Sequence, residues 1–367
     1  MVELKKRTLG EVKALSRGEA VEIMRQAGIV GAGGGGFPTY FKYKSPQPHL
    51  IVNATESEPG YWADKVVHRE YFDEFLQVYE AMKVIFGIEQ ITMGVHQKDR
   101  EWFADYAEHA DGLYEMRYVP DKYALGEEKT LIKHATDKKV PRRVDMPDGS
   151  RRPGLPLDVG IIVNNSETLL NIYNALFLGK PVTTKFLQVF GEGIELRLFE
   201  VPLGASVTEV IGTAGVDVER SSYFSVIDGG PYLNEMGIEE LGTDDAYVRR
   251  TTNGLLLIPR GTPSKEYADI KTKAPEEGIV SLVGKVSGVH LPLGGRFLEP
   301  AEPLVSEGDE VEYEQKIGEP VDKGFSIGIW ASMDGTVSSI EDDVVAISGG
   351  AVNQEEARAE TEAEAAR

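Results

Sequence analysis

The sequence predicts an α/β fold whose sheet is mostly parallel, followed by a small β-grasp-like domain and an all-β C-terminal segment. In residues 1–180, short apolar runs alternate with helical patterns, which is typical of a parallel sheet covered by helices. Residues 181–228 follow the order strand, strand, helix, strand, and residues 281–349 contain short strands separated by tight turns. The length of 367 residues suffices for two or three such domains.

The first domain is expected to begin with a helix and to continue as strands connected mainly by helices. Ser16 and Glu19 have the spacing of a capping box, so this helix starts there and ends at Gly28. Pro38 suits the first turn of a short second helix. Strands are predicted over residues 50–53, 91–95, 113–119 and 159–163, and helices over residues 69–86, 99–110 and 169–178. Residues 138–153 are predicted to form a polar loop.

The remaining chain divides where the composition changes. Strands are predicted over residues 186–190, 194–201 and 224–227, with a helix over residues 206–213. Residues 229–280 are rich in glycine and proline and are interpreted as a linker. Residues 305–311 and 331–337 are the clearest strands of the all-β segment. Residues 350–367 have no apolar stripe and form a predicted acidic tail.

The composition excludes several functional classes. Sixty acidic and 39 basic residues give a net charge of −21, which argues against nucleic acid or an anionic membrane as partner. The absence of cysteine excludes disulfides, thiolate catalysis, cysteine-bound zinc and iron–sulfur clusters. The six histidines form no H-x-x-x-H pair, so no metal site is expected. Without a long apolar run or a signal peptide, the chain is expected to be cytoplasmic and to have no membrane span.

A glycine-rich loop is the most distinctive stretch of the sequence. Five of its six residues are glycine, namely Gly31, Gly33, Gly34, Gly35 and Gly36. A backbone without side chains lets a flat or anionic ligand approach closely. The stretch contains G-x-G-x-x-G, but a predicted helix precedes it where the dinucleotide-binding fingerprint requires a strand. The Rossmann interpretation therefore fails, and a phosphate-bearing ligand is still expected at the loop.

Three polar stretches lie beside predicted strands and helices. Residues 53–60 follow a buried strand directly, at the edge where open α/β sheets bind ligands. Glu127 and Glu128 open a helix, where acids commonly complement the helix dipole, so a purely structural role stays open. Residues 164–168 precede another helix. Ser166 as N-cap explains part of that stretch, but the two asparagines before it exceed what capping needs.

These stretches resemble the FMN- and NADH-binding flavoprotein subunit of respiratory complex I. The shared motifs are Gly33 to Thr39 with Lys42, Asn53 to Gly60, Tyr123 with Gly126 to Glu128, and Asn164 to Thr168. The order of domains is similar to that of the Rnf complex C subunit and, more closely, of the cobalamin reductases of propanediol utilisation. The resemblance implies an FMN/NADH-binding domain over residues 1–180, a β-grasp domain over 181–228 and a barrel-sandwich domain over 281–349.

The resemblance also implies a role for each motif residue. The phosphate and ribityl chain of FMN would be held by Gly31, Gly33, Gly34, Gly35, Gly36 and Lys42, and by Asn164, Asn165 and Thr168 at the phosphate end. The flavin pocket would be formed by Asn53, Thr55, Glu56, Ser57, Tyr123 and Gly126. Glu58, Glu127 and Glu128 would lie near the nicotinamide and its ribose and are the predicted catalytic residues. Phe37 would stack beside the bound nucleotide.

Three departures from the family bear on function. Thr55 stands where complex I has an acid, and Ser45 stands where complex I has the aromatic residue that stacks on adenine. The relatives carry cysteine-bound iron–sulfur clusters, and the cysteine-free linker 229–280 takes the place of that cluster domain.

The sequence leaves three functions open. The first is an FMN-dependent dehydrogenase that takes hydride from NADH or NADPH and passes electrons to an external acceptor or a partner protein. The second is a cobalamin reductase that works from flavin alone, with a corrinoid as acceptor. The third is a non-catalytic assembly subunit with a vestigial pocket. Association with a membrane complex or with further copies of the chain is also open.

Overall fold

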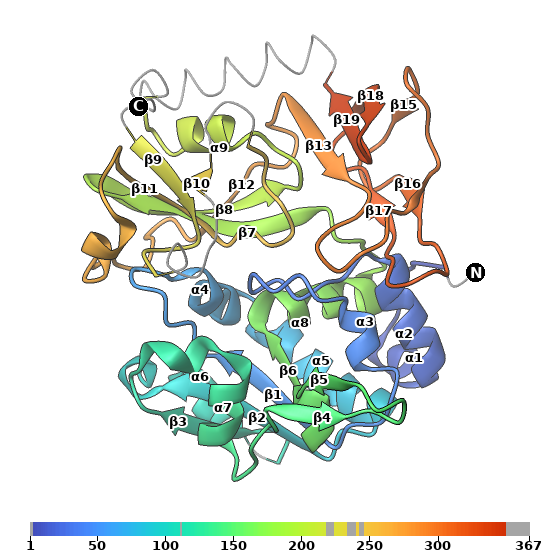
Figure 1. Cartoon of the computed structure of the whole chain (residues 1–367), viewed down its shortest axis with the longest axis vertical. Coiled ribbons are helices and arrows are strands. Elements are labelled where there is room, and N and C mark those ends of the chain that lie inside the picture. Colours follow the sequence, from blue (N-terminus) through green and yellow to red (C-terminus); the bar gives the residue numbers. More distant parts are fainter. Residues whose placement is uncertain (1–2, 111, 218–223, 233–239, 242–245, 350–367) are drawn as a thin grey trace. The chain divides into compact units, whose positions relative to one another are not determined.

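The computed structural model describes residues 3–110, 112–217, 224–232, 240–241 and 246–349 (Figure 1). The described chain folds into two compact units. The first unit contains the described residues up to Met24, together with Thr39–Ser57 and Val67–Gly179. The second unit contains Arg25–Pro38, Glu58–Val66 and the described residues from Lys180 onward.

The first unit is built on a four-stranded parallel sheet in the order β3-β2-β1-β6. Its strands are β1 (His49–Ala54), β2 (Gln90–His96), β3 (Glu115–Val119) and β6 (Ile161–Asn165). The chain adds β2 and β3 on one side of β1 and then places β6 on the other side. The winding therefore reverses between β1 and β6, which is the topological switch point where open α/β sheets bind ligands.

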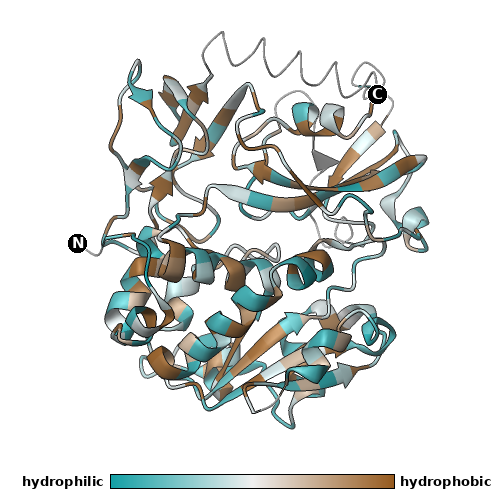
Figure 2. Ribbon diagram, turned by 180° about the vertical axis from the view of Figure 1, so that it is seen from behind, coloured by the Kyte–Doolittle hydropathy of each residue, from teal (hydrophilic) through white to brown (hydrophobic). Residues whose placement is uncertain are grey.

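Helices accompany this sheet, and their sequence signals are largely confirmed. They are α1 (Leu9–Lys13), α2 (Arg17–Gln26), α3 (Thr39–Lys42), α4 (Ala63–Glu70), α5 (Phe72–Phe86), α6 (Ala104–Glu108), α7 (Glu128–Ala135) and α8 (Ser166–Tyr173). The predicted capping box of α2 is present, because Glu19 N–H donates to Ser16 Oγ and Ser16 N–H to Glu19 Oε2. Ile51, Leu131 and Val163 belong to one apolar cluster between sheet and helix, and Figure 2 shows the strands largely brown.

Four predictions for the first unit were wrong in detail. The helix expected over residues 69–86 is two helices, because Tyr71 has φ −112° and ψ 35°, outside the helical region. The helix expected over 99–110 shrinks to α6 after a 3₁₀ turn at Gln97–Asp99. The predicted loop 138–153 contains a hairpin of β4 (Arg143–Asp145) and β5 (Arg151–Pro153), closed by a bond from Met146 N–H to Ser150 O. The N-cap of α8 is Asn165 and not Ser166.

The second unit contains a six-stranded sheet in the order β10-β9-β11-β7-β8-β12. The strands are β7 (Thr184–Gly191), β8 (Ile194–Pro202), β9 (Phe224–Asp228), β10 (Glu240–Leu241), β11 (Gly254–Pro259) and β12 (Ile279–Ser281), and α9 (Val207–Thr213) follows β8. The predicted strand–strand–helix–strand order is present. Residues 229–280 differ from the predicted linker, because β11 lies between β7 and β9 in the interior of this sheet.

The C-terminal part of the second unit forms two small antiparallel sheets, as the all-β pattern predicts. One has the order β13-β19-β18-β15 and the other β14-β16-β17. Their strands are β13 (Gly288–Pro292), β14 (Glu302–Pro303), β15 (Glu310–Val311), β16 (Lys316–Glu319), β17 (Ile329–Trp330), β18 (Gly335–Glu341) and β19 (Val344–Ser348). The predicted acidic tail 350–367 lies outside the described residues. No helix among the described residues is long and apolar enough to cross a membrane.

A buried histidine in the first unit makes stability sensitive to acid. His68 on α4 is fully buried among Phe75, Phe103 and Tyr106, and neither ring nitrogen has a hydrogen-bond partner in the described part of the chain. Burial lowers its pKa from 6.5 to about 3. The unfolded chain therefore takes up a proton as the pH falls below 6.5, whereas the folded protein does not until about pH 3.

We therefore expect His68→Phe to remove an acid-dependent loss of stability. At pH 5 this loss is about 2 kcal/mol in the wild type, and above pH 6.5 it vanishes. Urea unfolding of both proteins at neutral pH and at pH 5 measures it. The matched control is His134→Phe at an exposed position, which should keep the wild-type pH dependence. An unchanged pH dependence in His68→Phe would show that His68 is not buried neutral.

Candidate functional site

Three asparagines lie at the switch point of the parallel sheet in the first unit. Asn53 near the end of β1 pairs with Asn165 at the end of β6, and Val52 pairs with Asn164. Because both strands are parallel, their carboxyl ends meet at the same edge of the sheet. The structure thus brings together two of the polar stretches that the sequence singled out.

The exit of β1 is held by a compact set of hydrogen bonds. Asn53 Nδ2 donates to Gly126 O at 3.1 Å, and Asn53 Oδ1 accepts from Thr55 N–H at 3.0 Å. Thr55 is fully buried, with Oγ1 2.8 Å from Leu125 O. A Cβ added at Gly126 would lie 3.7 Å from both Ser57 Oγ and Thr55 O. These bonds fix the turn at Tyr123–Gly126 against the strand exit.

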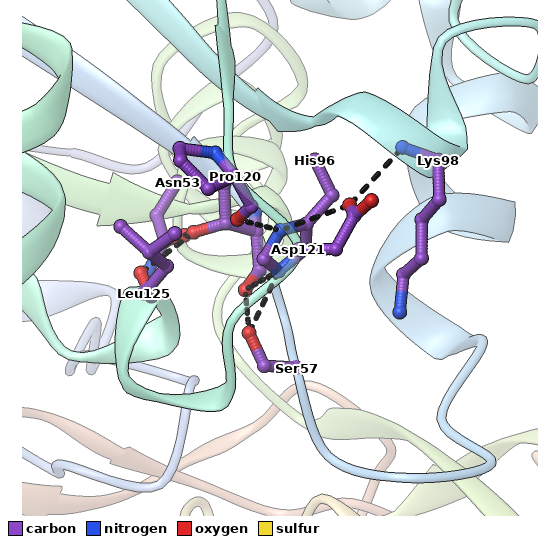
Figure 3. Close-up of polar contacts among 8 residues, drawn as sticks. Asn53, Ser57, His96, Lys98, Pro120, Asp121 and Leu125 are labelled. Atoms are coloured by element: carbon purple, nitrogen blue, oxygen red, sulfur yellow. Dashed lines mark hydrogen bonds and ion pairs between the residues drawn. The ribbon is translucent and has the colours of Figure 1, made fainter.

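Two residues that the sequence analysis missed, His96 and Asp121, lie near the same strand exit. His96 at the end of β2 is buried, and its Nε2 lies 2.7 Å from Ser57 Oγ and 3.2 Å from Thr55 O (Figure 3). Its Nδ1 lies 3.1 Å from Pro120 O and 3.8 Å from Asp121 Oδ1. His96 is the last residue of β2, and Asp121 comes shortly after β3, so both lie at the carboxyl edge of the parallel sheet. Their position at this edge is the sequence signal that could have identified them.

Oxygen atoms lie at both ring nitrogens of His96. Burial lowers the pKa of His96, and the hydrogen bond to Pro120 O partly opposes that shift. Nδ1 faces Pro120 O, and Nε2 faces both Thr55 O and Ser57 Oγ, whose hydroxyl donates to Thr55 O at 2.8 Å. The carboxylate of Asp121 is too far from Nδ1 for a hydrogen bond, so this is not a Ser-His-Asp triad. His96 instead orients Ser57.

The asparagines of β6 have different environments. Asn165 Oδ1 accepts from Thr168 N–H at 3.2 Å and from Thr168 Oγ1, so both predicted phosphate ligands serve the N-cap of α8. Asn164 is buried, and its Nδ2 donates to Tyr43 OH. Its Oδ1 is buried without a hydrogen-bond partner among the described residues. This oxygen can therefore accept a hydrogen bond from a group that the described residues do not supply.

The acidic pair and the lysine also have defined partners. Glu127 caps α7 by accepting from Thr130 N–H at 2.9 Å, which is the structural role left open by the sequence. Glu128 pairs with Lys42 at 3.1 Å, and Lys42 Nζ also donates to Val163 O at 2.8 Å. Lys42 is thereby held at the carboxyl end of β6. Tyr123 is 38% exposed and Glu56 is half-buried at the same strand exits.

The glycine loop belongs to the second unit, where Val30 pairs with Pro38 as an isolated antiparallel bridge. Gly31 N–H donates to Phe37 O at 2.8 Å, and Gly36 N–H donates to Gly31 O at 3.0 Å. Gly34 and Gly36 have φ of 87° and 64°, which other residues rarely adopt. Gly33, Gly34 and Gly35 are exposed, and their N–H groups donate to no acceptor in the described chain. Such free N–H groups suit an anion.

Two further predicted residues of the second unit are engaged by distant parts of the sequence. Phe37 is half-buried and makes edge-to-face contacts with Phe297 and Phe325, with ring centroids 5.8 and 5.6 Å apart. Glu58 is buried, and its Oε1 accepts from Tyr232 N–H at 2.6 Å. The described residues contain no cluster of three His, Asp or Glu that could hold a metal ion.

Comparison with known proteins identifies two domains. Residues 24–174 match the Nuo51 FMN-binding domain, and residues 268–354 match the RnfC barrel sandwich hybrid domain. The chain is 30% identical to the cobalamin reductase PduS of Citrobacter freundii over 264 residues, which is 72% of this chain and 54% of the relative. It is 32% identical to the C subunit of the ion-translocating oxidoreductase complex of Vibrio cholerae over 218 residues, 58% of this chain and 27% of that relative.

A solved structure has the same fold. The NAD⁺-reducing [NiFe]-hydrogenase in its H₂-reduced state matches with a TM-score of 0.51 at 20% identity, covering 70% of this chain and 49% of that one. The chain spans about half the length of the cobalamin reductases it matches. The α/β fold and the barrel-sandwich segment predicted from the sequence are confirmed.

Proposed function

Because residues 24–174 form a domain of the Nuo51 FMN-binding family and residues 268–354 one of the RnfC barrel sandwich hybrid family, we propose that the chain is an FMN-dependent electron-transfer subunit. In this proposal it accepts hydride from NADH or NADPH and passes electrons to an external acceptor. The observation that carries the proposal is Asn164, whose buried carbonyl oxygen lacks a donor in the described chain at the switch point of the sheet.

The residues present fit an FMN molecule. Asn164 Oδ1 is an acceptor without a donor among the described residues, and the N–H groups of Gly33 to Gly35 are donors without an acceptor there. Ribityl hydroxyl groups are donors of the kind that Asn164 Oδ1 can accept from, and phosphate oxygens are acceptors of the kind that the loop N–H groups can donate to. The proposed binding residues are Gly31, Gly33, Gly34, Gly35, Gly36, Phe37, Lys42, Asn53, Thr55, Glu56, Ser57, Tyr123, Gly126, Asn164, Asn165 and Thr168. Bound FMN would supply hydride acceptance and one-electron transfer.

The protein's own residues would bind and orient. His96 and Asn53 fix the strand exit that carries Thr55 and Ser57, so these polar groups are held in place before a ligand arrives. Glu128 neutralises part of the charge of Lys42. We retain Glu58, Glu127 and Glu128 as proposed nicotinamide-side residues, with the additional structural roles that their hydrogen bonds give to Glu58 and Glu127.

The route of the electrons beyond the flavin is also a proposal. With no cysteine, the chain cannot hold a cysteine-bound iron–sulfur cluster. A protein partner or a corrinoid must therefore come close to the flavin. The similarity to proteins named cobalamin reductase supports the corrinoid, and the similarity to a subunit of an oxidoreductase complex supports a protein partner. We propose a cytoplasmic location, in which NADH and NADPH are available.

Flavin content tests the proposal. The purified protein, or apoprotein incubated with FMN, should bind FMN in a 1:1 ratio, measured after gel filtration and release by heat. Absence of binding would instead support the non-catalytic assembly subunit. To test the corrinoid alternative, cob(II)alamin is added to the reduced protein, and an unchanged corrinoid spectrum would exclude it as acceptor.

A further inference from the structure

A turn in the second unit places an arginine beside Gly28, just before the glycine loop, and an asparagine beside Gly34 in that loop. Asp228 at the end of β9 anchors this turn, because it accepts from Thr252 Oγ1 at 3.2 Å and from Asn253 N–H at 3.3 Å. Arg249 N–H donates to Thr252 Oγ1 at 3.1 Å, and Thr252 N–H donates to Arg249 O at 3.0 Å. The turn is therefore a built structure with a defined conformation.

This turn runs along the glycine loop. A Cβ added at Gly34 would lie 3.2 Å from Asn253 Nδ2, and one added at Gly36 would lie 2.9 Å from Thr251 Cγ2. A Cβ added at Gly28 would lie 3.9 Å from Arg250 Nη2. Side chains at Gly34 and Gly36 would press against the turn, so these two glycines let the segments approach closely, whereas at Gly28 the close contact is with Gly328 O at 2.6 Å.

The side chains of the turn have unmet hydrogen-bonding capacity. Arg250 Nε and Nη2 are buried and have no partner in the described chain, and Asn253 Oδ1 is buried and also without one. Burial lowers the pKa of Arg250 to about 10, so the guanidinium is still charged at neutral pH. Arg250 as a whole is half-buried, and its two buried, unpaired nitrogens can donate to an anion that the described residues do not provide.

We propose that Arg250, Asn253 and the free N–H groups of Gly33 to Gly35 form a subsite for a phosphate ester that carries a neighbouring hydroxyl group. The guanidinium and the loop N–H groups donate to phosphate oxygens, and Asn253 Oδ1 accepts from the hydroxyl. Both the ribityl phosphate of FMN and the ribose pyrophosphate of a dinucleotide have this chemistry. The inference deepens the proposed function and rests on it, since it assigns the phosphate side of the nucleotide that we place at the glycine loop.

Calorimetric titration of the full-length apoprotein with FMN, riboflavin and ADP-ribose tests the subsite. We expect Arg250→Met to weaken binding of FMN or ADP-ribose by about 10- to 100-fold, as for other hydrogen bonds to charged groups. Riboflavin, which has no phosphate, should bind as in the wild type. A loss confined to FMN assigns the subsite to the flavin phosphate, and a loss confined to ADP-ribose assigns it to the dinucleotide.

The neighbouring Arg249 provides a matched control, because it is exposed on the same turn. Arg249→Met should bind all three ligands like the wild type, and Arg250→Lys should recover part of the lost affinity. The unfolding temperature of Arg250→Met should equal or exceed that of the wild type, since a buried unpaired charge is removed. Should Arg250→Met fail to fold, Asn253→Leu tests the same subsite with the same ligands.

Two results would overturn the inference. One is wild-type affinity of Arg250→Met for both FMN and ADP-ribose, and the other is an equal loss in Arg249→Met. A wild-type protein that binds none of the three ligands would contradict the proposed function itself, so the two failures are distinguishable.

Discussion

Gly35→Val is expected to weaken FMN binding about tenfold or more, a change of about 1.4 kcal/mol or more in binding free energy, with the unfolding temperature of the apoprotein unchanged. Gly35 is exposed, its φ lies outside the left-handed region, and an added Cβ would meet no atom within 4 Å. The free protein therefore accommodates a side chain at this position. A ligand that lies against the backbone of the loop would not, because the isopropyl group would occupy its place.

Gly18→Val on α2 is the matched control for this experiment. Gly18 also has open space around an added Cβ and no left-handed φ. Equilibrium titration with FMN, followed by fluorescence, and thermal unfolding are measured for both variants. Wild-type FMN affinity in Gly35→Val would mean that the glycines serve only the packing of the loop, and the loop would lose its proposed role.

The double substitution Asn164→Leu with Tyr43→Phe is expected to weaken FMN binding and to leave the apoprotein folded. Asn164 Oδ1 has no partner in the described chain, while its Nδ2 bonds only Tyr43 OH there. Removing both polar partners from a buried site is nearly neutral for stability, whereas leaving a hydroxyl donor of the bound ligand unsatisfied weakens binding by about 1–3 kcal/mol. The affinity should thus fall by roughly 5- to 150-fold.

Tyr43→Phe alone separates the two roles of this pair. It removes the partner of Asn164 Nδ2 but keeps Oδ1, so FMN affinity should fall much less than in the double variant. Urea unfolding of the apoproteins and FMN titration provide both quantities. Equal FMN affinity of the double variant and the wild type would show that Asn164 does not contact the flavin.

The sequence predicted the parts of the fold that depend on local signals. The capping box of Ser16 and Glu19 and the four parallel strands follow from neighbouring residues. The edge of the sheet that carries Asn53 and Asn164 also followed, because the polar residues come directly after apolar runs.

The features that the sequence did not predict depend on contacts between distant segments. β11 lies in a glycine- and proline-rich region, and its strand conformation follows from pairing with β7 and β9. His96 meets Ser57 only because β1 and β2 are parallel neighbours. Glu58 is fixed by Tyr232, 174 positions later in the chain. No local pattern encodes such pairings.

The central claim is that this chain binds FMN and reduces it with NADH or NADPH. An anaerobic titration of the FMN-loaded protein, followed by its visible spectrum, tests that claim most directly. We predict that at least one of NADH and NADPH, added in stoichiometric amount, bleaches the absorbance of oxidised flavin. Oxygen should then restore this absorbance. Bound flavin that stays oxidised under an excess of both nucleotides would contradict the account.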